Sequence, residues 1–264
     1  ATLKNIVPLT KMHGTRNDFV LIDQRNARLS NYAEAARYLC DRHAGIGADG
    51  LLVVLPSRVD DVRMRIFNPD GSEAQMCGNG IRCLAAYLRD EGAPANVRVE
   101  TLAGTIFTHC EREADRFVVS VVLPPPQVEP ATDIPNAYVV MAGNPNVVIF
   151  GDGLHGRNLA ASGPDISSRY RDGANVHLVL VAARNRIEVC HWERGAGVTL
   201  SCGTGAVAAA AAAIYRGDAD SPVEVCVPGG VLTVEWDGTG PATLTGEAVR
   251  VFDATVHYDD ALAN

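Results

Sequence analysis

Two short segments of this chain repeat one pattern at a long distance along the sequence. Residues 76–88 read MCGNGIRCLAAYL and residues 201–213 read SCGTGAVAAAAAA, so each is a Cys-Gly-x-Gly motif that opens an apolar run. The cysteines of the two motifs, Cys77 and Cys202, are separated by 202 − 77 = 125 residues. Self-similarity at one spacing indicates a repeated structural unit. We therefore expect two related halves that fold in the same way.

Two further pairs of segments echo each other at nearly the same spacing. Residues 100–108 (ETLAGTIFT) resemble residues 226–234 (CVPGGVLTV) at an offset of 226 − 100 = 126. Residues 12–20 loosely resemble residues 141–147 at an offset of 141 − 12 = 129. Because the three echoes come in the same order, they favour a duplicated domain over coincidence.

The boundary between the halves is marked by prolines. The β-rich run at residues 118–123 is followed by Pro124, Pro125 and Pro126, and proline has no N–H group to continue a sheet ladder. We predict an N-terminal domain of residues 1–123 that carries Cys77 and a C-terminal domain of residues 124–252 that carries Cys202. Residues from about 253 to 264 are expected to pack back on the first domain.

Within each half, short β-rich runs alternate with few helices. Residues 31–43 predict an amphipathic helix with Ser30 as its N-cap. The runs that follow the two cysteines, roughly residues 79–90 and 204–215, are apolar nearly all round, and a helix of that kind is buried. The sequence therefore predicts an α+β fold of two pseudo-symmetric domains, each a mixed or antiparallel sheet wrapped around a central helix.

A cysteine just before a helix has unusual chemistry. The first N–H groups of a helix have no partner within it, and the aligned peptide dipoles place roughly half a positive charge there. A thiol at this end ionises more easily than a free thiol, and a carboxylate can bind the exposed N–H groups. Glycines next to each cysteine let the backbone approach a ligand closely: Gly78, Gly80, Gly203 and Gly205.

Duplication gives the two cysteines complementary roles. If the related domains pack about a pseudo-two-fold axis, both helix N-termini face one cleft, and a carboxylate bound there holds its α-carbon between two sulfurs. One thiolate would remove the α-proton while the opposite thiol delivers a proton to the other face. The helix ends would stabilise the developing negative charge. The pattern thus predicts inversion of a stereocentre.

Two alternatives compete with this interpretation. One Cys-Gly-x-Gly motif by itself would indicate packing, but two echoing motifs favour function. A disulfide between Cys77 and Cys202 would be an oxidised, inactive state. The chain has 7 cysteines and no Cys-x-x-Cys pair, which weakens a zinc site, and most of the others are expected to be small buried residues.

Composition limits the partners of the chain. The formal net charge of −8 argues against nucleic acid, because phosphate binding needs a basic face. No apolar run reaches membrane-spanning length, and the first residues lack the apolar region of a signal peptide. We expect reduced thiols in the cytoplasm, a small-molecule partner, no nucleic acid and no membrane.

The sequence resembles the diaminopimelate epimerase family over essentially its whole length. Five blocks carry the resemblance: residues 11–19 (KMHGTRNDF), 42–50 (RHAGIGADG), 67–73 with 76–82 (FNPDGSE, MCGNGIR), 143–145 (GNP) and 192–197 with 201–205 (WERGAG, SCGTG). The resemblance implies interconversion of LL- and meso-diaminopimelate, on the bacterial route to lysine and peptidoglycan, without pyridoxal phosphate, metal or other cofactor. Relatives are often homodimers, so a homodimer is the expected assembly.

The resemblance also implies roles for individual residues. Cys77 and Cys202 correspond to the two acid–base residues. The residues expected to hold the α-carboxylate through helix N-termini are Gly78, Asn79, Gly203 and Thr204. Those expected to line the substrate cleft are Asn17, Asn68, Asn144, Asn175, Glu193 and Arg194. Arg194 suits a distal carboxylate, because its guanidinium offers two parallel donors, and Glu193 suits an ammonium group.

Taken singly, several of these residues have simpler interpretations. Asn17 and Asn68 lie in sequences common in turns, Asn175 would not stand out without the resemblance, and Glu193 with Arg194 could be a solvated pair. His13, His43, His177 and His191 are expected to be structural or surface residues.

The chain also departs from the family at three positions. Asn146 stands where a histidine is usual, Val198 where a glutamate is usual, and Arg16 where a small or polar residue is usual. These departures keep two alternatives open: a racemase of the same fold acting on another amino acid, and a non-catalytic amino-acid-binding protein.

Overall fold

The computed structural model describes residues 5–27, 29–151 and 158–258. The chain divides into two compact units: unit 1 comprises the residues up to Val121 and those from Glu247 onward, and unit 2 comprises Val122–Gly246. That residues 1–123 and 124–252 fold as two domains stays a prediction. Residues 1–4, and residues 259–264 of the segment expected to return, lie outside the described residues.

Unit 1 is a mixed sheet with two helices. Its helices are α1 (Tyr32–Cys40) and α2 (Gly78–Asp90). Its strands are β1 (Asn5–Gly14), β2 (Asn17–Asp23), β3 (Gly50–Leu55), β4 (Val62–Phe67), β5 (Glu73–Ala74), β6 (Asn96–Thr101), β7 (Gly104–Glu113), β8 (Arg116–Leu123) and the end of β17 (Ala242–Tyr258). The pairs β2–β3 and β4–β6 are parallel, whereas β1–β2, β3–β4, β6–β7 and β1–β17 are antiparallel.

Unit 2 repeats this order of elements. Its helices are α3 (Leu159–Ser167) and α4 (Gly203–Tyr215). Its strands are β9 (Gln127–Pro130), β10 (Ala137–Met141), β11 (Pro145–Phe150), β12 (Asn175–Ala183), β13 (Arg186–Glu193), β14 (Gly197–Thr199), β15 (Val223–Val227), β16 (Gly230–Glu235) and the start of β17. The pairs β11–β12 and β13–β15 are parallel, while β10–β11, β12–β13 and β15–β16 are antiparallel. Strand directions therefore follow one pattern in both units.

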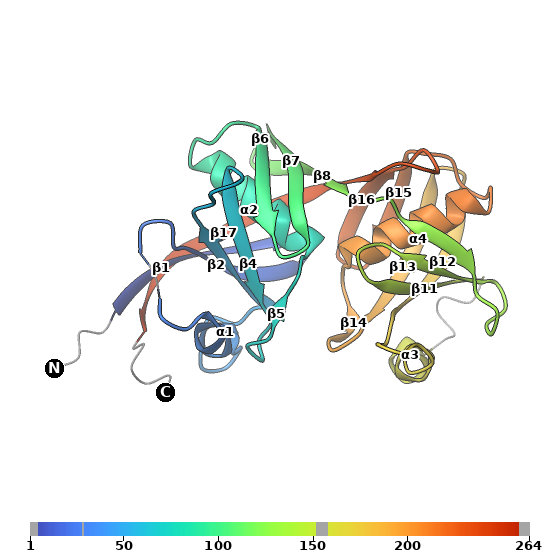
Figure 1. Cartoon of the computed structure of the whole chain (residues 1–264), viewed down its shortest axis with the longest axis horizontal. Coiled ribbons are helices and arrows are strands. Elements are labelled where there is room, and N and C mark those ends of the chain that lie inside the picture. The colour runs from blue at the N-terminus through green and yellow to red at the C-terminus, as the bar shows by residue number, and fades with distance from the viewer. Residues whose placement is uncertain (1–4, 28, 152–157, 259–264) are drawn as a thin grey trace. The chain divides into compact units, whose positions relative to one another are not determined.

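A helix of 13 residues is buried in each unit, α2 in unit 1 and α4 in unit 2. Figure 1 shows each of these helices lying along the strands of its own unit. In α4 every residue from Ala206 to Ala213 is fully buried. Alanine loses no side-chain entropy on folding and lets a helix lie close to a sheet. The predicted α+β fold, with a sheet around a central helix in each half, is confirmed.

The strands beneath these helices are buried on both faces. All six residues of β3 are buried, because α1 packs against the face that carries Leu51 and Val53, while Leu52 lies beside α2. In β12, Val176 and Leu178 pack in a cluster with α3, and the alternating residue His177 lies against α4. Alternation of side chains across a strand thus places His177 beside the central helix.

The helix near residue 31 differs from its prediction. It spans Tyr32–Cys40 and not residues 31–43, and its N-cap is Asn31 and not Ser30. The Asn31 side chain accepts a hydrogen bond from the N–H of Glu34 at 3.2 Å, as a capping residue does. The helix stops at Cys40, because Asp41 adopts an extended backbone and its carboxylate accepts hydrogen bonds from the next turn.

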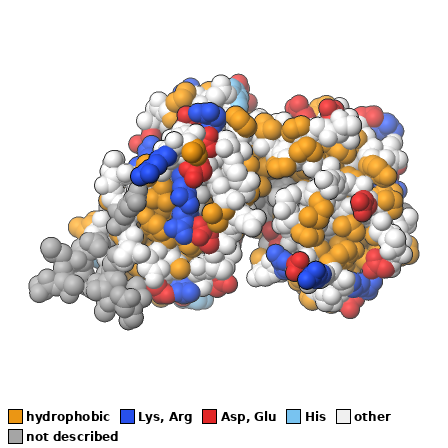
Figure 2. Space-filling view, viewed as in Figure 1, with side chains coloured by type: hydrophobic (Ala, Val, Ile, Leu, Met, Phe, Trp, Pro, Cys, Tyr) orange, Lys and Arg blue, Asp and Glu red, His pale blue; other side chains and the backbone are white. Residues whose placement is uncertain are grey.

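Basic and acidic side chains are interspersed on the visible face (Figure 2). Ion pairs such as Arg65–Glu73, Arg184–Asp220 and Arg250–Asp90 join neighbouring elements within each unit. Exposed pairs of this kind contribute little to stability, but they neutralise much of the arginine charge. No helix in the described parts of the chain is long and apolar enough to cross a membrane.

Candidate active site

Both motif cysteines are N-caps of the central helices. Cys77 precedes Gly78, the first residue of α2, with φ −143° and ψ 119°; Cys202 precedes Gly203, the first residue of α4, with φ −133° and ψ 116°. The two backbones therefore have nearly the same conformation. Each cysteine stands at the end of a helix where N–H groups are exposed and the dipole is positive.

The Cys202 thiol is deeply buried. Its side chain is 4% exposed, and Sγ accepts a hydrogen bond from the N–H of Gly205 at 3.3 Å and lies 3.6 Å from Thr204 Oγ1. Burial, and next the negative charge of Glu193, raise the pKa of the Cys202 thiol well above its usual range, although the bonds from Thr204 and Gly205 oppose the shift. Cys202 is therefore a neutral thiol at neutral pH.

Glu193 is held beside this thiol by the end of β13. Its carboxylate accepts a hydrogen bond from Thr199 Oγ1 at 2.6 Å and is hydrogen-bonded to Cys202. The strands β13 and β14 form a hairpin in which Glu193 pairs with Gly197. This hairpin places the Glu193 carboxylate next to the Cys202 thiol. From the sequence we had expected Glu193 to bind an ammonium group, and its contact with the thiol was not predicted.

The Cys77 thiol lies beside two asparagines. Cys77 is half-buried, and its Sγ makes a long contact of 3.9 Å with Asn17 Oδ1. The same oxygen accepts a hydrogen bond from Asn79 Nδ2 at 3.1 Å. Asn17 Nδ2 donates to Asp49 Oδ2 at 2.8 Å, which fixes the amide with its oxygen toward Cys77. The predicted residues Asn17, Cys77 and Asn79 are thus brought together.

Four charged residues form a cluster next to Asn17, and this cluster was not predicted from the sequence. Arg42 binds Asp49 at 2.9 Å and Asp18 at 2.8 Å, and Lys11 binds Asp18 at 2.6 Å. Although burial raises it, hydrogen bonds from Arg42 and Lys11 hold the pKa of the Asp18 carboxyl well below its usual range. These four residues lie within the first two blocks of the family resemblance, which was the available signal.

A strained hairpin turn sets the position of Asn17. Thr15 and Arg16 both have positive φ, 52° and 63°, which is uncommon for residues other than glycine. Thr15 is held there by Arg82 Nη2, which donates to its Oγ1 at 2.7 Å. Arg82 is fully buried in α2 with no ion pair among the described residues, and burial lowers the pKa of its guanidinium. This buried cation favours negative charge at Cys77.

In unit 2, three predicted residues meet around Asn146. Asn146 Nδ2 donates to the backbone oxygen of Asn144 at 2.7 Å, and Asn175 Nδ2 lies 3.5 Å from Asn146 Oδ1. Asn175 Oδ1 accepts a hydrogen bond from the N–H of Arg194 at 3.0 Å. The exposed guanidinium of Arg194 donates to the backbone oxygen of Asp172. The structure therefore groups Asn144, Asn175 and Arg194 around Asn146.

Asn68 serves a local turn. Its side chain donates to Ser72 Oγ at 3.0 Å, and its N–H donates to the oxygen of Ser72 at 2.8 Å. The residue is exposed, and its hydrogen bonds with Ser72 and Gly71 lie within this turn. The simpler interpretation of Asn68 as a turn residue accounts for these contacts.

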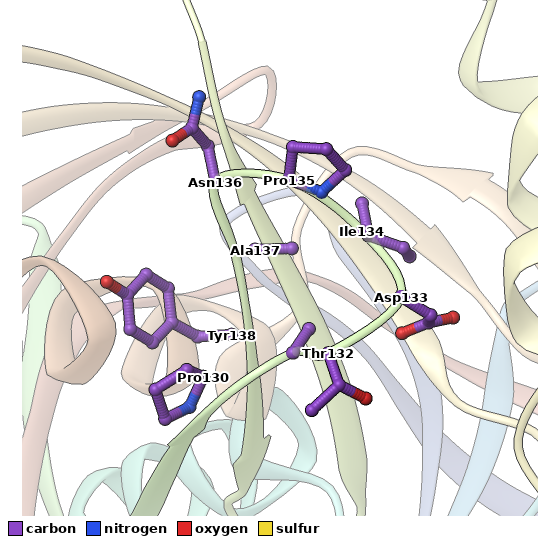
Figure 3. A pocket seen from close by; sticks show the side chains of 9 residues that line it. Pro130, Thr132, Asp133, Ile134, Pro135, Asn136, Ala137 and Tyr138 are labelled. Atoms are coloured by element: carbon purple, nitrogen blue, oxygen red, sulfur yellow. The ribbon is translucent and has the colours of Figure 1, made fainter.

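A surface pocket lies in the first part of unit 2 (Figure 3). It is formed by the loop from β9 to β10 and is lined by residues 130–138, with the side chains of Asp133, Ile134 and Tyr138 around it. None of the predicted site residues lines it. Asp133 is the one carboxylate among the lining residues, so the pocket offers no acid–base pair for proton transfer.

Two buried histidines give a testable pH dependence. Burial lowers the pKa of His191 to about 3, and burial together with His191 lowers the pKa of His177 well below its usual range. Below pH about 6.5 the unfolded chain binds these protons and the folded chain does not, so stability falls as pH falls. We expect a loss of about 1.4 kcal/mol per pH unit for each histidine, measured by urea unfolding between pH 6 and pH 5. A flat profile in the parent protein would contradict the neutral pair.

Comparisons with known proteins agree with the two-unit plan. A family model described as diaminopimelate epimerase matches residues 9–127 and 138–251. The diaminopimelate epimerase of Desulforudis audaxviator is 42% identical over 270 residues, with 92% of this chain and 97% of that protein covered. That of Pseudomonas entomophila is 40% identical over 277 residues, with 95% and 99% covered.

Solved structures with low identity share the fold. A phenazine biosynthesis protein of the PhzF family from Bacillus anthracis has a TM-score of 0.77 and 17% identity, covering 96% of this chain and 99% of that chain. A hydroxyproline epimerase from Agrobacterium vitis, with bound trans-4-hydroxy-L-proline, has a TM-score of 0.76 and 17% identity, covering 100% and 96%. At such identity the likeness concerns the fold alone.

Proposed function

Because this chain belongs to the diaminopimelate epimerase family, we propose that it interconverts LL- and meso-diaminopimelate by moving the α-proton between Cys77 and Cys202. The observation that carries the proposal is the equivalent placement of the two cysteines. Both are N-caps in extended conformation, and each opens a buried helix of 13 residues. A two-base inversion needs such a matched pair of acid–base groups.

The protonation states suggest how the reaction begins. Cys202, buried beside Glu193, starts as the thiol, while the buried Arg82 cation favours ionisation of Cys77, whose Sγ must leave its long contact with the Asn17 amide oxygen to act as the thiolate. The Cys77 thiolate takes the α-proton of the isomer that is bound, and the electron pair of the broken C–H bond moves toward the α-carboxylate. The Cys202 thiol then protonates the opposite face. Cys77 ends as thiol and Cys202 as thiolate, which is the starting state for the reverse direction.

The remaining residues would bind the ends of the substrate. We assign the α-carboxylate to the helix N-termini at Gly78, Asn79, Gly203 and Thr204, where N–H groups and dipoles also stabilise the developing charge. Asn144, Asn175 and Arg194 suit the distal carboxylate, and Arg194 would leave the Asp172 oxygen to bind it. Asn17 and Asn68 complete the set expected in the cleft.

The two thiols should differ in reactivity. We expect iodoacetamide at pH 8 to modify Cys77 at least tenfold faster than Cys202, because Cys77 is half-buried whereas Cys202 is 4% exposed with a raised pKa. Peptide mass spectrometry of the reduced, ligand-free protein, sampled over time, measures both rates. The half-buried Cys190 serves as an internal reference away from the helix ends. Equal rates at Cys77 and Cys202 would contradict the assignment of resting states.

A direct assay tests the proposed activity. The reduced protein is incubated with LL-diaminopimelate, and the meso isomer is measured by chiral separation; proline, 4-hydroxyproline and lysine are offered in parallel. We expect conversion of diaminopimelate alone. Conversion of another amino acid instead would select the racemase alternative, and binding without conversion would select the binding protein. Asn146, which motivated the first alternative, is fully buried, so its difference from the family does not by itself favour another substrate.

Two further expectations remain proposals. We place the protein in the cytoplasm, where its 7 cysteines would stay reduced, and we propose a homodimer. Light scattering coupled to gel filtration of the 264-residue chain would test the assembly, since a monomeric mass would exclude the dimer.

A further inference from the structure

Three polar side chains are buried together beside the first turn of α4. Asn146, His177 and His191 are each 0% exposed, and none belongs to the set of residues expected to touch substrate. His177 lies on β12 next to Asn146 on β11, since the strands are parallel and Val148 is its register partner. Buried polar groups of this kind need their hydrogen bonds satisfied, so their arrangement can be worked out atom by atom.

The amide of Asn146 can have one orientation only. Its Nδ2 lies 2.7 Å from the backbone oxygen of Asn144 and 3.3 Å from that of Val140. Carbonyl oxygens accept hydrogen bonds and never donate them, so the NH₂ group of Asn146 must face these two atoms. Its Oδ1 therefore faces the other way, toward His177.

This orientation fixes the tautomers of both histidines. His177 Nε2 lies 2.9 Å from Asn146 Oδ1, which can only accept, so Nε2 carries the proton. His177 Nδ1 is then a bare acceptor, and His191 Nδ1, 2.9 Å away, must donate to it. His191 Nε2 remains an unprotonated nitrogen with no hydrogen-bond partner in the described chain. The lowered pKa of each imidazole agrees with a neutral pair.

The other end of this chain of hydrogen bonds reaches a predicted substrate residue. Asn146 Nδ2 is also 3.2 Å from Asn144 Oδ1, so that oxygen is turned inward as an acceptor. The NH₂ group of Asn144 is consequently turned away from Asn146. An amide NH₂ is the right group for a carboxylate, which only accepts, whereas an amide oxygen in the same place would repel it.

We propose that Asn146 and His177 are positioning residues that turn the Asn144 amide so that its NH₂ group faces a carboxylate of the substrate. The proposal rests on the proposed function in one respect, namely that the substrate presents a carboxylate to Asn144. Through Asn175, whose Nδ2 is 3.5 Å from Asn146 Oδ1, the same pair also reaches the backbone of Arg194. Asn146 is thereby hydrogen-bonded to Asn144 and Asn175, two residues that are expected to hold the same end of the substrate.

The first test needs neither substrate nor a variant. Nitrogen-15 NMR of the full chain, labelled at histidine, distinguishes the tautomers of each imidazole. We expect the Nε2–H form at His177 and the Nδ1–H form at His191, both unchanged between pH 8 and pH 6. The opposite tautomer at His177, or a protonated ring in that range, would overturn the orientation of Asn146 and with it the proposal.

The second test asks whether His177 acts through Asn144. His177→Leu removes the donor to Asn146, while His177→Gln keeps an N–H at about the same place. We expect His177→Leu and Asn144→Ala each to raise KM by about tenfold with a smaller change in kcat. His177→Gln should stay within about threefold of the parent protein. The double variant His177→Leu/Asn144→Ala should be no worse than Asn144→Ala alone.

The outcomes separate this proposal from the proposed function. Additive effects of the two substitutions on KM, or equal effects of leucine and glutamine at position 177, would overturn the positioning role in an active enzyme. A parent protein that binds and converts no diaminopimelate would sink the proposed function, while the tautomer measurement would still decide the orientation of Asn146. If His177→Leu does not fold, that measurement decides the proposal.

Discussion

Alanine in place of either Cys77 or Cys202 is expected to lower the rate of epimerisation by about 10³-fold or more. In the proposed mechanism each thiol supplies the proton transfer on one face of the α-carbon, and a positioned acid–base group is worth about 10² to 10⁴ in rate. Losing one group stops inversion in both directions, because the remaining thiol can exchange a proton on its own face only. The measurement is kcat and KM for LL-diaminopimelate under reducing conditions, with the unfolding temperature of each variant.

The matched control is Cys226→Ala. Cys226 is a half-buried cysteine within β15, one residue before its end and outside any helix N-terminus, so its loss should leave the rate within about twofold. A rate above a tenth of the parent rate in either Cys77→Ala or Cys202→Ala would contradict the two-base mechanism. Loss of the same size in all three variants would indicate a general effect on folding.

Gly205→Ala should be the most damaging change among the glycines of the two motifs. A Cβ at this position would lie 2.4 Å from His177 Cε1, closer than atoms can approach. The imidazole cannot retreat, because Asn146 and His191 hold it on both sides. The first turn of α4 must therefore shift, and with it the Gly205 N–H that binds Cys202 Sγ.

The expected cost of this change is about 1 to 3 kcal/mol of stability, as for overpacking, even though alanine favours a helix over glycine by about 1 kcal/mol. Turnover should fall as well, because Cys202 moves with the turn. The control is Gly80→Ala, the equivalent position in α2, where the nearest atom is the mobile end of Leu52 at 3.0 Å. Its stability should change by less than about 1 kcal/mol. Equal unfolding free energies for the two variants, measured in urea, would contradict the close packing of Gly205 against His177.

The fold could be predicted largely because one pattern occurs twice. Cysteine and glycine followed by an apolar run is a strong local signal for a helix start, and its repetition after 125 residues gave the duplication. The structure places both helices within one residue of their expected starts, at Gly78 and Gly203. The N-cap of α1 was harder, because Ser30 and Asn31 are both good capping residues and only the backbone decides between them.

The contacts that shape the site were less visible, since they depend on neighbours across strands. Asp49 reaches Asn17 because β2 and β3 are parallel, with Phe19 opposite Gly50. His177 faces α4 because of its place in the alternation of β12, and no sequence pattern marks it as the partner of Asn146. Hydrogen bonds between distant polar residues follow from register, which a single sequence does not specify.

The fate of the α-proton in D₂O shows whether two cysteines work on opposite faces of one α-carbon. LL-diaminopimelate is converted to less than a tenth of its equilibrium extent, and both isomers are analysed for deuterium by mass spectrometry. We expect one deuterium at the inverted centre of the meso product and almost none in the recovered LL isomer, because the incoming proton comes from a second thiol that has equilibrated with solvent. Deuterium entering the LL isomer as fast as product forms, or product that keeps the original proton, would mean that one base serves both faces and would contradict the two-base mechanism.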